Sequence, residues 1–253
     1  RLLGFRKSKY DYVCILDSDN YLGQDDWISQ MVSPLDKNSE LVASYTRYYR
    51  YDPKQTLFNR YLALIGGTDP VVYYMGKADR QSWAETPLNQ VEILKFDKNN
   101  FPTLGSNGSV IRKNVINFKS LSADNFFHTD ILYDLLDEGK NTYARVNTMF
   151  VHDTGSTFAE QIARRYKYMS IHHLKMLSAR RYKIFDSQKI SDWLKLIKFI
   201  FITLTLVIPT IDAIKGYIKS KDSAWFMHPI YCFIYCFSYG YAVTRHSIDR
   251  LFS

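Results

Sequence analysis

The stretch Tyr12-Val-Cys-Ile-Leu-Asp-Ser-Asp19 decides the expected fold of this chain. Its first five residues form an apolar run without alternation, which is typical of a strand buried on both faces in a mostly parallel sheet. The run ends abruptly in Asp17 and Asp19, where open α/β sheets bind ligands. Because carboxylate oxygens suit a hard divalent cation, we predict a metal site here. A surface turn rich in Asp and Asn is the alternative.

The residues after this stretch continue an α/β pattern. Asp25 and Asp26 precede a short amphipathic helix, and residues 41–45 form the next predicted strand. Residues 46–100 are interpreted as a variable insert with helices over 55–65 and 79–84. A glycine-containing loop then leads into a short strand that ends near residue 112.

The following segment repeats the alternation of helices and strands. Residues 130–138 have leucines and isoleucine at helical spacing, closed by Gly139 at a predicted C′ position. Two strands are predicted over 143–146 and 149–152. A second helix is predicted from the capping box Thr157-Phe-Ala-Glu160.

Composition excludes some classes of protein and leaves others open. The chain has 253 residues, 46% of them apolar, and a formal net charge of +8. It is too apolar to be disordered, and its basic balance fits nucleic acid, anionic lipid or phosphate-bearing substrates equally well. We expect no nucleic-acid partner, because the basic residues mostly flank an apolar tail and form no single stripe. The three cysteines show no zinc or disulfide pattern, which favours a reduced, cytosol-facing chain.

The tail differs in composition from the rest of the chain. Residues 199–211 carry no charge but contain Pro209, and residues 224–243 form an uncharged, aromatic-rich segment of twenty residues. About 20 apolar residues span a membrane. The lysines and arginines around these segments favour re-entrant or interfacial helices on the cytoplasmic side. Two buried helices of a soluble domain are the alternative. We predict a main domain over 1–180 and membrane-associated helices over 181–253.

Other polar residues have both structural and functional interpretations. Asn107 and Gly108 belong to a glycine-flanked turn that can present backbone N–H groups to a sugar. Asp130 suits a helix-capping carboxylate or a general base. His152 suits a packed histidine or a metal ligand. Arg165 and its neighbours suit a solvated basic face or a site for a diphosphate.

The order of these features resembles the family 2 glycosyltransferases of the GT-A fold, from Arg1 to about Tyr168. The segments that carry the resemblance are Arg1-Leu-Leu-Gly4, Leu16-Asp-Ser-Asp19, Gly105-Ser-Asn-Gly108, Phe127-His-Thr-Asp-Ile131 and Gln161-Ile-Ala-Arg-Arg-Tyr166. The resemblance implies a Rossmann-like α/β fold. It also implies inverting transfer of a sugar from a nucleotide-diphosphate sugar.

The resemblance also assigns roles to individual residues. Asp17 and Asp19 are similar to the D-x-D pair that holds the metal and the donor diphosphate, and His152 is similar to the histidine that completes the metal shell. Gly105, Asn107 and Gly108 are similar to the loop under the donor sugar and acceptor. Arg164 and Arg165 resemble the helix that closes over the diphosphate, although Tyr166 falls one place late. The implied cofactor is Mn²⁺ or Mg²⁺.

The tail resembles that of members that work on cell-surface glycans. It implies a lipid-linked or polysaccharide acceptor at the cytoplasmic membrane, with the catalytic domain facing the cytoplasm.

The sequence departs from the family pattern at the catalytic base and at its start. The usual aspartate of the E-D-x-D pattern falls on His128, while Asp130 matches the second aspartate. Either residue can serve as the base, and Asp130 is slightly favoured. Family members carry further nucleotide-binding strands upstream of Arg1, so we expect an N-terminally truncated chain. A catalytically inactive, membrane-bound subunit that binds glycan or nucleotide is the alternative function.

Overall fold

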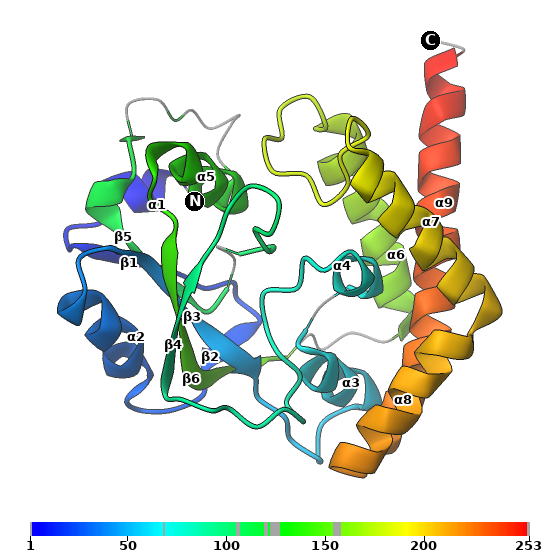
Figure 1. Ribbon diagram of the computed structural model, residues 1–253, viewed down its shortest axis with the longest axis horizontal. Helices are drawn as coiled ribbons and strands as arrows, with labels where there is room; N and C mark the ends of the chain where they lie inside the picture. The colour runs from blue at the N-terminus through cyan, green and yellow to red at the C-terminus, as the bar shows by residue number, and fades with distance from the viewer. Residues whose placement is uncertain are drawn as a thin grey trace.

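The chain folds into a mixed β-sheet with helices on both faces and a separate layer of helices beside it (Figure 1). The computed structural model describes residues 2–67, 69–104, 107–118, 121, 127–153 and 158–251. Its strands are β1 (Tyr12–Ile15), β2 (Asn20–Leu22), β3 (Leu41–Tyr49), β4 (Val91–Lys95), β5 (Ser109–Arg112) and β6 (Thr142–His152). Its α-helices are α1 (Leu2–Lys7), α2 (Trp27–Lys37), α3 (Leu57–Ile65), α4 (Pro70–Tyr74), α5 (His128–Asp134), α6 (Phe158–Tyr168), α7 (Ile190–Thr205), α8 (Val207–Ser220) and α9 (Met227–Leu251).

Short helical segments of other types extend these elements. A 3₁₀ turn at Leu135–Glu138 continues α5 and ends at Gly139, whose φ of 73° confirms the predicted C′ position. A π-helical segment at Met169–Lys175 continues α6, and further 3₁₀ turns lie at Lys113–Val115 and Ser223–Phe226.

The sheet has the order β1-β5-β3-β6-β2, and β4 also pairs with β6. The prediction of a mostly parallel sheet is wrong, because only β3 and β6 pair in parallel among the described strands. β5 lies between β1 and β3 and runs antiparallel to both. The three strands β1, β3 and β6 therefore share one direction, as a crossover through α2 requires, but β1 and β3 are not neighbours.

The position of β1 at the sheet edge corrects a second prediction. A strand buried on both faces was expected, yet Cys14 is exposed and only Ile15 of β1 is buried. An edge strand is covered on fewer sides than a central one, and β3 is the strand buried along nearly its whole length. The two strands predicted over 143–146 and 149–152 are one strand, β6.

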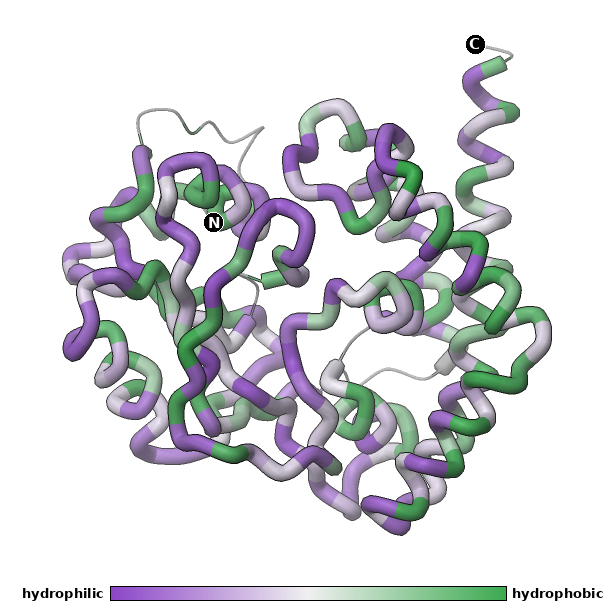
Figure 2. The backbone as a smooth tube through the Cα atoms, in the orientation of Figure 1, coloured by the Kyte–Doolittle hydropathy of each residue, from purple (hydrophilic) through white to green (hydrophobic). Residues whose placement is uncertain are grey.

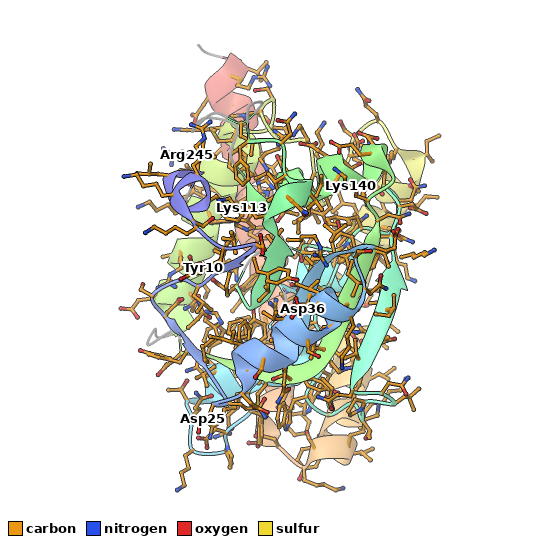
Figure 3. All side chains as sticks on the ribbon, turned by 90° about the vertical axis from the view of Figure 1, so that its left-hand side faces the viewer. Tyr10, Asp25, Asp36, Lys113, Lys140 and Arg245 are labelled. Atoms are coloured by element: carbon orange, nitrogen blue, oxygen red, sulfur yellow. The ribbon has the colours of Figure 1, made fainter. Side chains whose placement is uncertain are left out.

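Helices cover the two faces of the sheet through separate apolar clusters. Trp27, Met31 and Leu35 recur every four residues along α2 and are at most 1% exposed, packed against β3, β5 and β6. Figure 3 shows α2 lying across this face, with Asp25 just before its first turn. The opposite face packs against α1 and α5.

The third cluster joins the predicted insert to the tail. Apolar side chains of α3, including Tyr61, pack with Trp225, Tyr231 and Tyr235 from the C-terminal part of the chain. Arg60 Nε lies 3.0 Å from Asp222 Oδ2 across the same contact. Residues of the insert and of the tail therefore form one helical layer.

The helix predicted over 79–84 is wrong, and its backbone hydrogen bonds explain why. The N–H of Gln81 donates to the carbonyl of Arg47 in β3 at 3.0 Å, and the N–H of Trp83 donates to the carbonyl of Ala63 in α3 at 3.1 Å. These N–H groups have partners in other elements rather than four residues back. The segment is an irregular link between the sheet and the helical layer, with a turn closed by the N–H of Glu85 on the carbonyl of Ser82 at 3.0 Å. The helix predicted over 55–65 is confirmed as α3, capped by Thr56.

Among the described residues, no single helix is long and apolar enough to cross a membrane, while α7 and α8 pass such a test as a pair bent by 76°.

Candidate active site

The link between β1 and β2 presents the two predicted carboxylates. The chain turns tightly after β1, because the N–H of Asn20 donates to the carbonyl of Asp17 at 3.1 Å. Asp17 and Asp19 are both half-buried on this turn. The Nδ2 of Asn20 also donates to Asp19 Oδ1 at 2.8 Å, which orients the second carboxylate.

Asn107 holds Asp17 through two reciprocal hydrogen bonds. Its Oδ1 accepts the backbone N–H of Asp17 at 2.8 Å, and its Nδ2 donates to Asp17 Oδ2 at 3.0 Å. A bond to a carboxylate is stronger than one between neutral groups. The glycine-flanked turn and the carboxylate turn, 90 residues apart in sequence, therefore form one structural unit.

Gly108 allows this approach because of its backbone conformation. Its φ is +69°, and a Cβ at this position would lie 2.6 Å from the ring of Phe150 and 3.0 Å from Thr46 Oγ1. The Gly108 carbonyl accepts the N–H of Thr46 at 3.0 Å, which anchors the turn to β3. Only glycine satisfies both the positive φ and the close packing. Gly105, the other predicted glycine of this loop, lies outside the described residues.

His152 lies beside Asp19 at the end of β6. In the β2–β6 ladder Asn20 pairs with His152, and His152 Nε2 is 3.5 Å from Asp19 Oδ2. Burial lowers the pKa of His152, and the positive charges of Arg165 and Arg80 also lower it. The nearby Asp19 carboxylate acts in the opposite direction. The net shift is downward, so the imidazole is biased toward the neutral form that binds metals.

These donors fit a divalent cation that takes its other ligands from substrate. An imidazole nitrogen and a carboxylate oxygen are both accepted metal-ligand types, and Mg²⁺ usually keeps several waters and binds substrate phosphates. No group of three or more His, Cys, Asp or Glu side chains in the described part of the chain can hold a metal. Asp19 and His152 are thus the two predicted ligands that the structure pairs, while Asp17 is bonded to Asn107.

Arg80 is a charged residue of this region that the sequence analysis missed. It is buried, its Nε donates to Thr46 Oγ1 at 3.2 Å, and one terminal nitrogen donates to the carbonyl of Asn107. Its guanidinium lies 4.8 Å from the ring centre of Tyr49, whose ring is 5.4 Å from that of His152. Arg80 thus holds the Asn107 turn through a hydrogen bond to its backbone carbonyl, and it brings a fixed positive charge near His152.

Asp79 neutralises part of that charge. Its Oδ2 is 2.6 Å from Arg80 Nη1, in a pair with both side chains buried. Burial raises the pKa of Asp79, and Arg80 opposes that shift. In the sequence, the only indication of this pair is that Asp79 and Arg80 are adjacent. An adjacent Asp-Arg pair is common on solvated surfaces, so it does not by itself indicate a buried ion pair. Only burial distinguishes this pair.

The two predicted arginines of α6 differ in their surroundings. Arg164 is exposed, whereas Arg165 is half-buried and interacts with Tyr235, Tyr239 and Asp69. Burial lowers the pKa of Arg165, but these oxygens raise it by more, so the guanidinium stays charged. The charge of Arg165 also acts to lower the pKa of His152 and of Tyr49, so it lies within electrostatic reach of both groups. The structure therefore associates Arg165 with the site.

Asp130 lies in a different environment from the other predicted site residues. It is 0% exposed; Arg180 Nε donates to its Oδ1 at 3.1 Å, and the N–H of Arg181 donates to its Oδ2 at 3.0 Å. Its carboxylate thereby anchors the segment after α6. His128, two residues earlier at the start of α5, is half-buried. Of the two candidate bases, His128 is the less enclosed.

The comparison with protein families agrees with this arrangement. Residues 1–117 match the model of the glycosyl transferase family 2. That segment contains the carboxylate turn, Asn107 and Arg80. The match supports a family 2 glycosyltransferase and implies a GT-A α/β fold, with a nucleotide-sugar donor and an acceptor. A search of curated proteins finds no match.

Proposed function

We propose that this protein transfers a sugar from a nucleotide-diphosphate sugar to an acceptor hydroxyl, with inversion at the anomeric carbon. The observation that carries the proposal is the unit formed by Asp17, Asp19, Asn107 and His152, within and beside the segment that matches the family. It combines two carboxylates, an imidazole and an oriented amide at the end of a strand, where α/β sheets bind ligands.

The residues divide the work of binding and orientation. Asp19 and His152 would hold a divalent cation, which when bound supplies positive charge for the donor diphosphate. Arg165 adds fixed positive charge on the α6 side, and Arg80 adds it beneath the Asn107 turn. Asn107 keeps Asp17 in place so that the turn does not rearrange when the donor binds.

The transfer itself is a single displacement. The acceptor oxygen forms a bond to the anomeric carbon while the bond from that carbon to the diphosphate oxygen breaks. The nucleoside diphosphate leaves with the electron pair, and the hydroxyl proton passes to a base. We assign the base to His128, because Asp130 is enclosed by Arg180 and by backbone N–H groups. Asp130 serves instead if the segment after α6 moves.

The proposed acceptor is a lipid-linked or polysaccharide hydroxyl at the cytoplasmic membrane, with the site facing the cytoplasm. The helices α7 to α9 expose many large apolar side chains, which supports a membrane surface as their partner. Nucleic acid is not part of the proposal.

A second candidate function follows from Asp130. If its ion pair with Arg180 is permanent and His128 cannot accept a proton, the protein binds donor or glycan without turnover. Such a protein would be a membrane-bound binding subunit.

The experiment is donor turnover by the protein in neutral detergent, across a panel of nucleotide sugars, with Mn²⁺, Mg²⁺ or chelator. Asp19→Asn is the test variant, and Asp25→Asn is the matched control, because Asp25 is exposed and precedes α2. His128→Ala and Asp130→Asn are measured in the same series.

We expect metal-dependent turnover of one donor, lost by about a hundredfold or more in Asp19→Asn and His128→Ala and retained in Asp25→Asn. Turnover that is unchanged by chelator would refute the role of Asp19 and His152. Donor binding without turnover would replace the enzyme by the binding subunit.

A further inference from the structure

A basic cavity of about 340 Å³ lies where α7 begins beside the end of α5, and none of its lining residues belongs to the carboxylate turn. Its lining residues are mostly cationic or polar and come from four separate segments: Lys77, Lys98, Asn99, Tyr133, Arg181, Lys183, Asp186, Lys189, Ser191, Asp192 and Lys195. Neither the proposed reaction nor the family match assigns a role to it.

Part of the positive charge in this cavity is already paired. Lys98 forms a 2.6 Å ion pair with Asp137, and Arg181 forms one of the same length with Asp134. The Asp192 carboxylate accepts the backbone N–H of Asp186 at 3.0 Å. The remaining cations are half-buried or buried and have no ion-pair partner among the described residues: Lys77, Lys183, Lys189 and Lys195.

Lys77 is the most enclosed of these cations. It is 5% exposed, and its ammonium donates to the carbonyl of Asn99 at 2.7 Å. Burial lowers its pKa, and the nearby charges of Lys195 and Lys189 lower it further, against the opposing effect of Asp192. Several ammonium groups therefore converge on a small volume, and an anion in that volume would relieve their repulsion.

The helix that begins at this cavity is apolar on its solvent side. Seven large side chains of α7 recur at helical spacing and are between 38% and 79% exposed: Ile190, Trp193, Leu194, Ile197, Ile200, Phe201 and Leu204. The buried side chains of α7, including Phe199 and Ile202, lie on its other side. A helix of a soluble domain normally buries its apolar stripe. Figure 2 shows green segments recurring along α7 and α8.

The cavity and the apolar face together have the chemistry of an amphiphile site. An anionic group fits the cluster of ammonium groups, and hydrocarbon fits the exposed face that starts at Ile190, next to Lys189. A free phosphate would use the first feature and leave the second unexplained. Interfacial helices combine these two features when they lie on an anionic membrane surface.

We propose that this cavity binds the phosphate head group of a membrane lipid, whose hydrocarbon chains lie along the exposed face of α7. The site is separate from the proposed sugar-transfer site and does not depend on that reaction. It would hold the domain on the membrane in one orientation, because the charged cavity and the apolar face contact the same lipid layer.

The test is vesicle co-sedimentation of the full chain with phosphatidylcholine vesicles, with and without phosphatidic acid. The pocket variant is Lys189→Gln with Lys195→Gln. The control is Lys7→Gln with Lys9→Gln, which removes the same charge from exposed positions in and after α1. A third variant, Ile197→Ser with Phe201→Ser, alters only exposed side chains of α7. Binding of glycerol 3-phosphate, measured by calorimetry, reports on the head group alone.

We expect phosphatidic acid to tighten vesicle binding by about tenfold or more, and the pocket variant to lose that gain while the control stays within about twofold. The α7 variant should weaken vesicle binding and leave the weak glycerol 3-phosphate affinity unchanged. Equal losses in the pocket variant and the control would overturn the proposal, since they indicate general charge attraction. Glycerol 3-phosphate binding as tight as vesicle binding would also overturn it, in favour of a soluble anion. Neither result bears on sugar transfer.

Discussion

Replacing Asn107 by alanine removes both hydrogen bonds that join the glycine-flanked turn to the carboxylate turn. The N–H of Asp17 loses its acceptor at 2.8 Å, and the Asp17 carboxylate loses its donor at 3.0 Å. The carbonyl of Asn107, which accepts from Arg80, is retained because it belongs to the backbone. The variant therefore tests the side-chain contacts alone.

The expected cost follows from the two bonds. A neutral hydrogen bond contributes about 1 kcal/mol and one to a carboxylate about 2 kcal/mol. Because Asp17 is half-buried, water can replace part of the lost hydrogen bonding. We therefore expect the free energy of unfolding to fall by about 2 kcal/mol. For a chain of this size that corresponds to a fall in Tm of about 4–8 °C. If the donor needs Asp17 in this position, donor affinity should also fall about tenfold.

Two assays separate these effects. Thermal unfolding reports the stability, and calorimetry with a nucleoside diphosphate and Mn²⁺ reports the affinity of the folded protein. Asn38→Ala is the matched control, because its side chain accepts a local bond from the N–H of Glu40, two residues away, at 3.0 Å. The control should lose about 1 kcal/mol or less and bind as the wild type does.

If Asn107→Ala lost no more stability than Asn38→Ala, the two hydrogen bonds to Asp17 would not stabilise the fold. A loss of stability with unchanged affinity would leave the two bonds a purely structural role. It would also remove Asp17 from the donor site.

Two further predictions concern the surrounding sheet. Gly108→Ala should destabilise the protein by about 2–4 kcal/mol. The φ of +69° at Gly108 disfavours a side chain, and a Cβ added there would lie 2.6 Å from the ring of Phe150. Thermal unfolding measures the loss of stability. Glu92 bridges Arg47 and Arg145 at 2.9 and 2.7 Å; burial raises its pKa, but the two arginines lower it by more. The ion pairs of Glu92 should therefore stabilise the folded protein fully above the ordinary Glu pKa of about 4.5. This stabilisation should be lost as the pH falls through the lower pKa that Glu92 has in the folded protein. Urea unfolding of Glu92→Gln and of the wild type at several pH values measures it.

Controls keep these two results specific. Gly76 also has a positive φ, 69°, but a Cβ added there meets no atom within 4 Å. Gly76→Ala should therefore lose less stability than Gly108→Ala. An equal cost would show that Phe150 does not matter. For Glu92→Gln, a stability difference from wild type that is the same at pH 3 and pH 7 would contradict the ion-pair explanation.

Local patterns in the sequence were sufficient for much of the fold. The apolar run before Asp17, the helix capped by Thr56 and the Gly139 terminus each depend on neighbouring residues, and all three are confirmed as a strand, a helix and a left-handed C′ position. Hydrophobic period and capping are local properties, so a single sequence carries them.

Other features depended on contacts between distant residues. The mostly parallel sheet was mispredicted because β5, which follows the insert, pairs antiparallel with both β1 and β3. The helix expected over 79–84 does not form because its N–H groups find acceptors in β3 and α3. Such partners are chosen by the packed chain, and a local window contains no information about them.

The same division applies to the candidate site. The sequence by itself determined the chemical types: two carboxylates after an apolar run, an amide between glycines, a late histidine and arginines on a helix. Only the tertiary structure decided that Asn107 bonds to Asp17, that His152 lies beside Asp19, that Arg165 rather than Arg164 is half-buried near Asp69, and that Asp130 is ion-paired with Arg180. The physical reason is that the identity of a side chain sets which partners it can bind. Its burial and its distance from those partners decide which of them it does bind, and both arise from contacts between residues 50 to 133 positions apart in the chain.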